Sequence, residues 1–188
     1  IISVDTFRSK VARMAIASGA SIINDISGGT MDDNMFKTVA ELKVPYILMH
    51  IQGTPQTMQQ NPEYENVVAE VIKYFSEKIN ELTRLGVNDI ILDPGFGFGK
   101  TIAHNFQLLA NLEYFDLFNL PVLSGLSRKS MINKVLNISS SSSLNGTTVL
   151  NTISLLKHTN ILRVHDVKEA VEVVRLAKQV ETYIHETG

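Results

Sequence analysis

Polar side chains stand where the expected strands end, and these residues are the ones best suited to chemistry. Six short apolar runs each finish in a polar group; the groups are Asp5, Asn24, His50, Asp93, Ser124 with Ser127 and Lys129, and Arg163 with His165. In parallel α/β folds the carboxyl ends of the strands meet at one face, where active sites form. The pattern therefore predicts one shared site.

One half of this set offers mainly hydrogen-bond acceptors. Asp5, Asn24 and Asp93 carry carboxylate or amide oxygens, and Asn24 adds amide donors. Such a set suits a flat nitrogen heterocycle that bears N–H groups, held by in-plane hydrogen bonds in a partly dry site. The structural alternative is that Asp5 only caps the helix that follows it.

The other half offers positive charge. Lys129, Arg163 and His165 suit a phosphate or pyrophosphate group. Alternatively, Arg163 pairs with a helix carboxylate, and His50 and His165 are satisfied histidines of the core.

The stretch Asp93–Lys100 joins a carboxylate at a strand tip to a loop with three glycines and a lysine. Its spacing fails both common phosphate motifs: Pro94 occupies the first glycine of a Walker A loop, and Lys100 occupies the third glycine of a dinucleotide fingerprint. Phe96 and Phe98 are apolar side chains that the loop cannot bury within itself, and Phe98 could pack against an aromatic second substrate.

Strand and helix patterns alternate six times along the chain. The expected strands cover residues 1–4, 21–23, 44–49, 89–92, 121–123 and 161–164. Amphipathic helical segments separate them, at spacings that suit right-handed crossovers between parallel strands. No linker or change in composition divides the chain, so the pattern predicts one α/β domain, either a barrel or a doubly wound sheet.

Composition narrows the function. The net charge is −2 and no Lys/Arg cluster occurs, which argues against nucleic acid as a partner. No apolar run approaches the length of a membrane span. Cysteine is absent, which excludes disulfides and thiolate metal sites and fits a reducing, cytoplasmic location. The histidines lack close ligand spacing, and no G-x-S-x-G elbow is present, so a protein-held metal and a serine triad are both disfavoured.

Several motifs, in order along nearly the whole chain, resemble dihydropteroate synthase, a family of pterin-binding enzymes. The motifs are Ser3-Val4-Asp5-Thr6, Ile23-Asn24-Asp25, Leu48-Met49-His50, Asp93–Lys100, Ser127-Arg128-Lys129-Ser130 and Arg163-Val164-His165-Asp166. The resemblance implies a TIM (β/α)8 barrel, of which this chain carries six βα units, the third to the eighth. It implies a transferase of folate biosynthesis that condenses 6-hydroxymethyl-7,8-dihydropterin diphosphate with 4-aminobenzoate by a dissociative substitution.

The resemblance also assigns roles to residues. Asp5, Asn24 and Asp93 would hold the pterin ring, and Met49 would pack on it. Lys129 would touch the pterin and border the 4-aminobenzoate pocket, with Phe98 and Ser127 beside it, while Arg163 and His165 would hold the diphosphate. The catalytic residues expected are Asp5, Lys129 and Arg163.

Further expectations come from the family alone. Its members use Mg²⁺ on the diphosphate, with the metal ligand in a loop that precedes the segment aligned with Ile1, so residues 1–188 are read as a single, N-terminally incomplete pterin-binding domain. Family members are homodimers, and sulfonamides mimic 4-aminobenzoate. Two alternatives stay open: a non-catalytic pterin-binding fragment, and the folate-binding domain of a methyltransferase.

Overall fold

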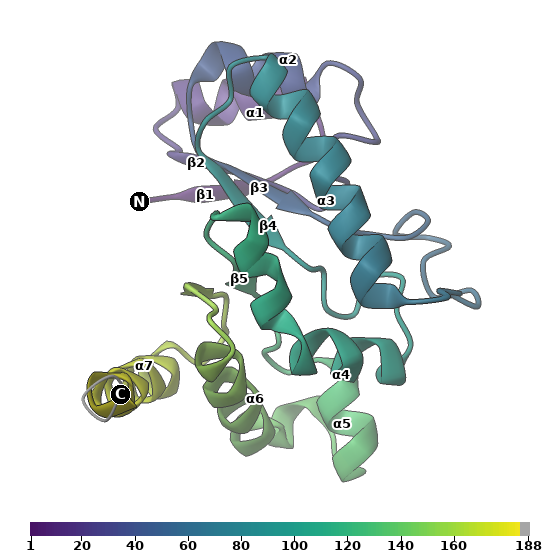
Figure 1. Ribbon diagram of the computed structural model, residues 1–188. Coiled ribbons are helices and arrows are strands. Elements are labelled where there is room, and N and C mark those ends of the chain that lie inside the picture. Colours follow the sequence, from purple (N-terminus) through teal and green to yellow (C-terminus); the bar gives the residue numbers. More distant parts are fainter. Residues whose placement is uncertain (185–188) are drawn as a thin grey trace.

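Parallel strands with helices packed outside them make up the computed structural model, which describes residues 1–184 (Figure 1). Strands β1 (Ser3–Asp5), β2 (Ile22–Asp25), β3 (Tyr46–Met49) and β4 (Ile90–Asp93) pair in that order. Strands β5 (Leu123–Ser124) and β6 (Ile161–Leu162) form a second parallel pair. A single parallel bridge between Leu92 and Val122 connects β4 to the β5 segment.

The strand order decides between the two predicted α/β folds. The described strands follow one another in sequence order, with no point at which the order reverses. A doubly wound sheet needs such a reversal, whereas consecutive staves of a (β/α) barrel do not. The predicted barrel class is therefore confirmed, as six successive βα units. Residues 185–188 of the predicted domain lie outside the described residues.

The helices follow the predicted alternation. Their bounds are α1 (Ser9–Ala17), α2 (Met35–Leu42), α3 (Val67–Arg84), α4 (Ile102–Ala110), α5 (Ser130–Leu136), α6 (Leu144–Leu156) and α7 (Val167–Ile184), with 3-10 turns η1 (Leu112–Phe118) and η2 (Ser140–Ser142). Helix α3 shows why they form. Val67, Val71 and Phe75 are buried at helical spacing, and Asn66 begins the helix by accepting hydrogen bonds from the backbone of Val68 and Ala69 at 3.1 and 3.0 Å.

The sheet separates a helix-facing core from a second face that carries the strand-end groups. Along β3, Tyr46 and Leu48 join the core formed with the helices, while Ile47 and Met49 are buried outside that cluster. Successive side chains of a strand point to opposite faces, so Ile47 and Met49 face the barrel interior. The strand pairing puts Asp5, Asn24 and Asp93 on the same face.

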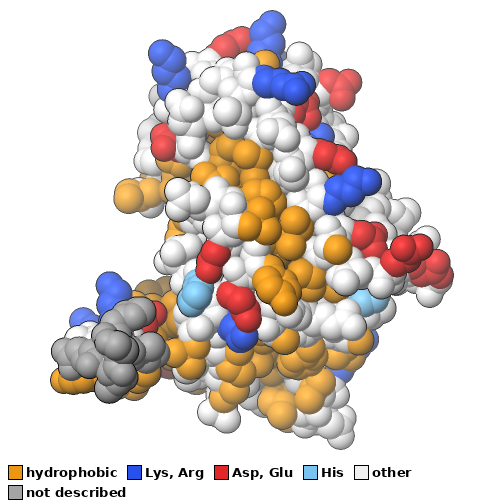
Figure 2. Space-filling model, in the orientation of Figure 1, with side chains coloured by type: hydrophobic (Ala, Val, Ile, Leu, Met, Phe, Trp, Pro, Cys, Tyr) orange, Lys and Arg blue, Asp and Glu red, His pale blue; other side chains and the backbone are white. Residues whose placement is uncertain are grey.

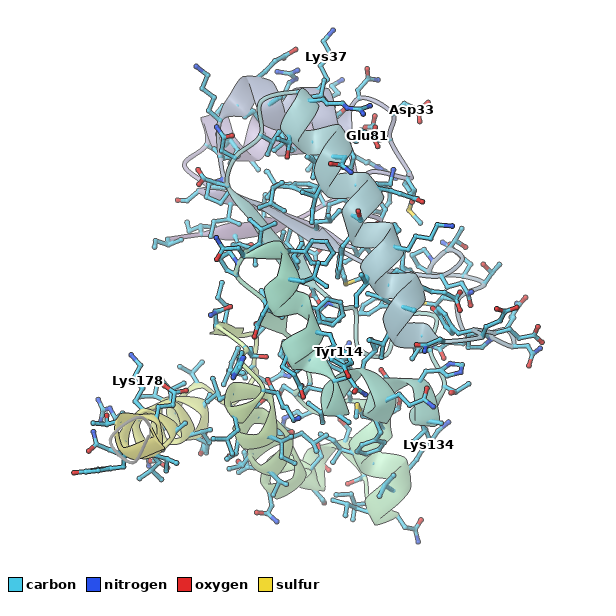
Figure 3. All side chains as sticks on the ribbon, viewed as in Figure 1. Asp33, Lys37, Glu81, Tyr114, Lys134 and Lys178 are labelled. Carbon is cyan, nitrogen blue, oxygen red and sulfur yellow. The ribbon has the colours of Figure 1, made fainter. Side chains whose placement is uncertain are left out.

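Charged side chains reach the solvent from several of the helices. Lys37, Lys134 and Lys178 project outward from three different helices (Figure 3). Hydrophobic side chains gather on the middle and lower part of the face seen in Figure 2. Among residues 1–184, no helix combines the length and apolar character that a membrane span requires.

Candidate active site

Two strand tips supply buried acceptors to the interior face. Asn24 at the end of β2 and Asp93 at the end of β4 are 5% and 0% exposed. One oxygen of Asp93 accepts a hydrogen bond from the backbone of Gly95 at 2.8 Å, which fixes the carboxylate at the start of its loop. The other oxygen, Oδ2, has no aligned hydrogen bond within the described residues, so it keeps its accepting capacity.

Arg163, which follows β6, reaches across the open face to both of these acceptors. Its guanidinium donates to Asn24 Oδ1 at 3.2 Å, and its Nη2 lies 2.8 Å from Asp93 Oδ2 as an ion pair without hydrogen-bond alignment. The Arg163 side chain is 40% exposed, so its cationic end stays accessible from solvent. Residues from three distant parts of the sequence thus meet at one point.

Gly125 makes this reach possible, and sequence reasoning missed it. A Cβ atom on Gly125 would lie 2.6 Å from Arg163 Nη2 and 3.2 Å from its Cζ. A side chain there would displace the guanidinium. The signal in the sequence is weak, because a glycine directly after a strand has many uses.

Asp5 lies beside this pair of acceptors. Its residue pairs with Asn24 in the strand register, and the backbone N–H of Thr6 donates to the Asn24 carbonyl at 3.0 Å. Asp5 is exposed, in contrast to Asn24 and Asp93. The three acceptors therefore lie in a row on one face, and their solvent exposure falls from Asp5 through Asn24 to Asp93.

The glycine loop after β4 brings an aromatic ring to a lysine. The Nζ of Lys129 lies 4.4 Å from the centre of the Phe98 ring, a cation–π arrangement. Burial lowers the pKa of Lys129, with Arg163 adding to the effect and Asp93 opposing it. Phe96 is 1% exposed and packs in the core, so Phe98 is the phenylalanine of this loop that faces the site.

Lys100, at the end of the same loop, is buried and contacts the loop's own carbonyl groups. It is 3% exposed, and its Nζ lies within 3.0 Å of the carbonyl oxygens of Gly95 and Phe98 and of the His50 ring nitrogen Nδ1. Burial lowers the pKa of Lys100 to about 7 and the pKa of His50 to about 2. Lys100 of the glycine loop and the strand-end residue His50 are thus both buried beneath the site.

Asn105 on α4 holds the outer side of this loop and was also missed. Its Oδ1 accepts a hydrogen bond from the backbone of Gly97 at 2.7 Å, and its Nδ2 donates to the carbonyl of Thr101 at 2.6 Å. It is 3% exposed. Nothing in the sequence distinguishes it from a surface asparagine on a helix.

Ser127 and His165 are neighbours at the edge of the site. The Ser127 hydroxyl lies 2.9 Å from His165 Nδ1 and accepts a hydrogen bond from the His165 backbone at 3.2 Å. His165 is exposed and Ser127 is buried. His165 is therefore not the buried core histidine of the alternative interpretation, whereas His50 is buried.

Two other residues of the recognised motifs have structural partners. Met49 is fully buried and pairs in register with Asp93, so its side chain belongs to the floor of the interior face. Arg128 has a left-handed backbone, with φ of 56°, and its guanidinium binds both carboxylate oxygens of Asp166 at 3.0 and 2.6 Å. This ion pair fastens the loop after β5 to the start of α7.

The donor set does not fit a metal ion held by protein side chains. Within residues 1–184, no three His, Asp or Glu side chains come together as a metal cluster. The groups around Asp93 are instead cationic, namely Arg163, Lys129 and Lys100. Such surroundings attract anions and repel a free cation.

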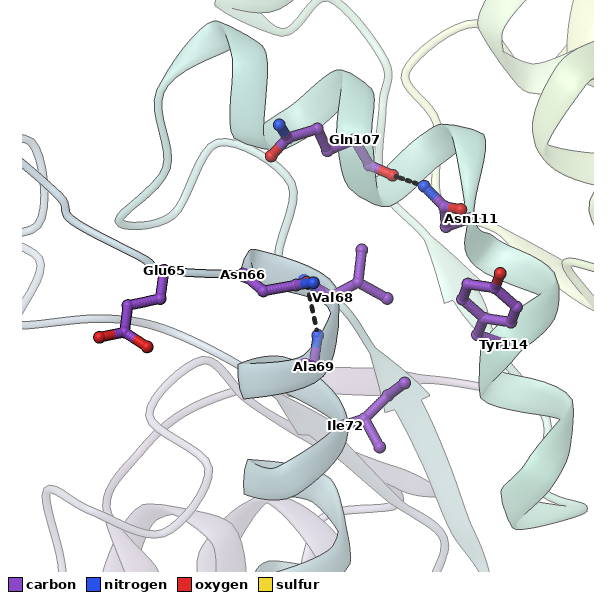
Figure 4. Close-up of a pocket in the computed structure, with 8 residues that line it drawn as sticks. All are labelled: Glu65, Asn66, Val68, Ala69, Ile72, Gln107, Asn111 and Tyr114. Atoms are coloured by element: carbon purple, nitrogen blue, oxygen red, sulfur yellow. Dashed lines mark hydrogen bonds between the residues drawn. The ribbon is translucent and has the colours of Figure 1, made fainter.

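A groove on the outer surface is separate from this site (Figure 4). It lies between the start of α3 and the α4–η1 segment and has a volume of about 390 Å³. Its lining residues are Glu65, Asn66, Val68, Ala69, Ile72, Gln107, Asn111 and Tyr114. No strand-end residue of the candidate site lines it.

An anion-attracting, acceptor-lined face at the carboxyl ends of parallel strands defines a barrel enzyme site, and comparison with known proteins specifies the family. Residues 1–165 match the family of pterin-binding enzymes. The chain belongs to this family.

Dihydropteroate synthases are the relatives that the chain resembles. It is 46% identical to the dihydropteroate synthase of Escherichia coli (strain K12) over 179 residues, and 42% identical to that of Haemophilus influenzae over 177 residues. These alignments cover 94% and 93% of the chain but 63% and 64% of the relatives. The chain thus spans less than two thirds of their length.

Solved structures agree with the sequence relatives. The Yersinia pestis dihydropteroate synthase in a sulfonamide drug complex superposes with a TM-score of 0.93 at 37% identity, over 96% of this chain and 66% of that one. The Xanthomonas albilineans enzyme in complex with 7,8-dihydropteroate gives 0.88 at 36% identity, over 95% and 66%. The described strands therefore have the arrangement of a dihydropteroate synthase barrel.

Proposed function

We propose that the protein carrying this chain is a dihydropteroate synthase of folate biosynthesis. It condenses 6-hydroxymethyl-7,8-dihydropterin diphosphate with 4-aminobenzoate and releases diphosphate. The observation that carries the proposal is the convergence of Asn24, Asp93 and Arg163 on one point, beside Lys129 and Phe98. This brings heterocycle acceptors, anion-binding cations and an aromatic wall within reach of a single ligand.

The acceptor row suits the pterin. Asn24 Oδ1 and Asp93 Oδ2, the two oxygens that Arg163 contacts, accept from the N–H groups of the aminopyrimidinone edge, and the apolar side chain of Met49 lines the floor beneath the ring. Asp5 lies at the exposed end of the row, where its negative charge favours positive charge that develops on the ring.

The cations suit the diphosphate and its departure. Arg163 and His165 are exposed at the same edge and can donate to phosphate oxygens. In a dissociative reaction the bond between the pterin methylene carbon and the diphosphate oxygen breaks first, and both electrons leave with diphosphate. The arylamine nitrogen then bonds to that carbon and loses a proton, so the amine needs positioning more than activation.

The 4-aminobenzoate pocket is proposed beside the loop Asp93–Lys100. The Phe98 ring offers a stacking face, Lys129 offers a charge for the carboxylate, and Ser127 offers a hydroxyl at the edge. A sulfonamide presents the same ring and a similar anionic end, so we expect it to compete at this place.

Magnesium and the assembly state belong to the same proposal. The described residues do not bring three metal-ligating side chains together, so we expect Mg²⁺ to arrive bound to the diphosphate. We expect a cytoplasmic homodimer. Exposed apolar side chains on α5 and α6 support the dimer: Val135, Leu136, Val149, Ile153 and Leu156. Light scattering of the protein and of Ile153→Glu, which should yield monomers, tests this.

Two measurements test the function. Incubation of the gene product with both substrates should yield dihydropteroate and an equal amount of diphosphate, measured by mass spectrometry and a phosphate assay. Asp5→Asn keeps the hydrogen-bonding shape and removes the charge, so it should retain pterin binding but lose turnover. If turnover survives in Asp5→Asn, the proposed stabilisation of the cation is wrong.

The alternatives predict different binding. The folate-binding domain of a methyltransferase would bind a pterin without regard to diphosphate, whereas Arg163 and His165 should make binding by this protein depend on diphosphate. A non-catalytic pterin-binding protein would bind both substrates and form no product.

A further inference from the structure

Lys100 is an unusual buried cation that the proposed chemistry does not use. Its ammonium is surrounded by neutral acceptors: the carbonyl oxygens of Gly95 at 3.0 Å, Phe98 at 2.9 Å and His50 at 3.4 Å, and the Nδ1 atom of His50 at 2.9 Å. Within the described residues, Lys100 makes no ion pair with a carboxylate. A buried cation without such a partner costs the fold free energy.

His50 is held so that it can only accept from Lys100. It is 6% exposed, and its ring meets Tyr74 edge-on with the centres 4.9 Å apart. Burial, with the nearby charge of Lys100, lowers the pKa of His50 to about 2, so the ring is neutral at ordinary pH. With Lys100 as donor, the His50 proton must lie on Nε2.

The conformation of the loop depends on the contacts that its carbonyl groups make with the Lys100 ammonium. The carbonyls of Gly95 and Phe98 both turn inward to one Nζ atom, and the Phe98 backbone donates to the Gly95 carbonyl at 3.0 Å. Gly95 has φ of 71°, and a Cβ there would lie 2.0 Å from the His50 carbonyl oxygen. The loop is therefore pulled tightly against the end of β3.

The loop contains Phe98, whose ring forms one wall of the proposed arylamine pocket. Phe98 lies 4.4 Å from the Lys129 ammonium, and a Cβ on Gly97 would lie 3.3 Å from Lys129 Cδ. The Lys129 side chain thus runs along the loop. At the other end of the loop, Asp93 accepts from Gly95 at 2.8 Å. A shift of the loop would move Phe98 and Lys129 while leaving the strands in place.

We propose that Lys100 is a positioning residue for the second substrate, acting with His50: its ammonium gathers the carbonyls of the glycine loop and so sets Phe98 and Lys129 in the arylamine pocket. This rests on the proposed function. Lys100 touches no substrate. It fixes the curvature of the loop in the way that a bound cation fixes a ring of carbonyls.

The test compares Lys100→Met with the unsubstituted gene product. Methionine fills a similar volume without donors. It removes the cost of the buried charge but leaves the carbonyls of Gly95 and Phe98 and the Nδ1 atom of His50 without their donor, so the protein should stay folded but lose some stability. The KM for 4-aminobenzoate should rise about tenfold, because a misplaced wall costs on the order of 1.4 kcal/mol of binding. The affinity for the pterin diphosphate should change less than about twofold. Lys157→Met, which removes a surface ion pair with Glu113, is the matched control.

Amide hydrogen exchange measures how well the loop is ordered and does not depend on enzyme activity. Lys100→Met should speed exchange at the Phe98 amide, which bonds to Gly95, while the amides of β3 and β4 stay protected. His50→Phe keeps a ring and removes the acceptor, so it should reproduce part of both effects and covers the case in which Lys100→Met fails to fold.

The outcomes separate this proposal from the proposed function. An unchanged KM for 4-aminobenzoate, with unchanged exchange at Phe98, would overturn the role of Lys100 even if the unsubstituted protein is an active synthase. A loss of stability together with equal losses in both substrates would make Lys100 merely structural. If the unsubstituted protein neither binds 4-aminobenzoate nor turns over, the proposed function fails, and the second-substrate role of Lys100 fails with it.

Discussion

Arg163 contacts the same acceptor oxygens that the pterin is proposed to use, so the two should compete for them. Its guanidinium contacts Asn24 Oδ1 at 3.2 Å and Asp93 Oδ2 at 2.8 Å. The aminopyrimidinone edge of a pterin presents N–H groups in a similar guanidine-like arrangement. A bound pterin must therefore displace Arg163, which becomes free to bind the diphosphate.

The structure gives the size of the effect. The ion pair is 40% exposed on the arginine side, so its contribution is about 1 kcal/mol. In Arg163→Met the competing guanidinium is gone, and the affinity for the pterin alcohol without diphosphate should rise about fivefold. The same variant loses charged hydrogen bonds to phosphate, worth about 1.5–3 kcal/mol each, so the affinity for the diphosphate ester should fall about tenfold or more.

Titration calorimetry with both ligands is the assay, and opposite changes are the expected result. Arg175→Met, at an exposed arginine of α7, serves as the control and should change neither affinity. If Arg163→Met weakens both ligands by the same factor, Arg163 does not compete with the pterin, and the displacement argument is refuted.

Three further changes test the fold and its pH dependence. Asn66→Ala removes the acceptor that begins α3 and should cost about 1 kcal/mol, a fall in Tm of about 2–4 °C by calorimetry; an unchanged Tm would show that water replaces the cap. Gly95→Ala should lower the free energy of unfolding, measured by denaturant titration, by about 1–3 kcal/mol more than Gly86→Ala does. Both glycines have positive φ, but only at Gly95 would the added Cβ collide with a backbone atom, the His50 carbonyl oxygen. The pKa of Lys100 is about 7 in the folded protein and 10.5 when the lysine is exposed, so between these pH values the unfolded chain holds a proton that the folded protein has lost. The free energy of unfolding, measured relative to Lys100→Met, should therefore rise with pH across that range. A difference that does not change with pH would contradict the burial argument.

The fold was largely predictable because its signals are local. Apolar runs of strand length, amphipathic helices and polar strand ends are repeated along the chain, and they indicate an α/β protein whatever the topology. The choice between a barrel and a doubly wound sheet was not local, since it depends on which strands pair. The bridge between Leu92 and Val122 joins the two strand groups in sequence order and decides it.

The candidate site was predictable in its residue types but not in its contacts. Polar groups at strand ends must share a face, so Asn24, Asp93 and Arg163 could be grouped from sequence. Which of them touch could not, because the reach of Arg163 depends on the missing side chain of Gly125, a residue with no chemistry of its own.

By itself the sequence determined the order of strands and helices, the polar row at the strand ends and, through its motifs, the family. Only the tertiary structure decided that Phe96 is core while Phe98 faces Lys129, and that Lys100 lies beneath the loop instead of in the site. The physical reason is that side-chain direction in an irregular loop has no period. It is set by which carbonyls, rings and helices happen to pack around the loop, and these come from residues far apart in the chain.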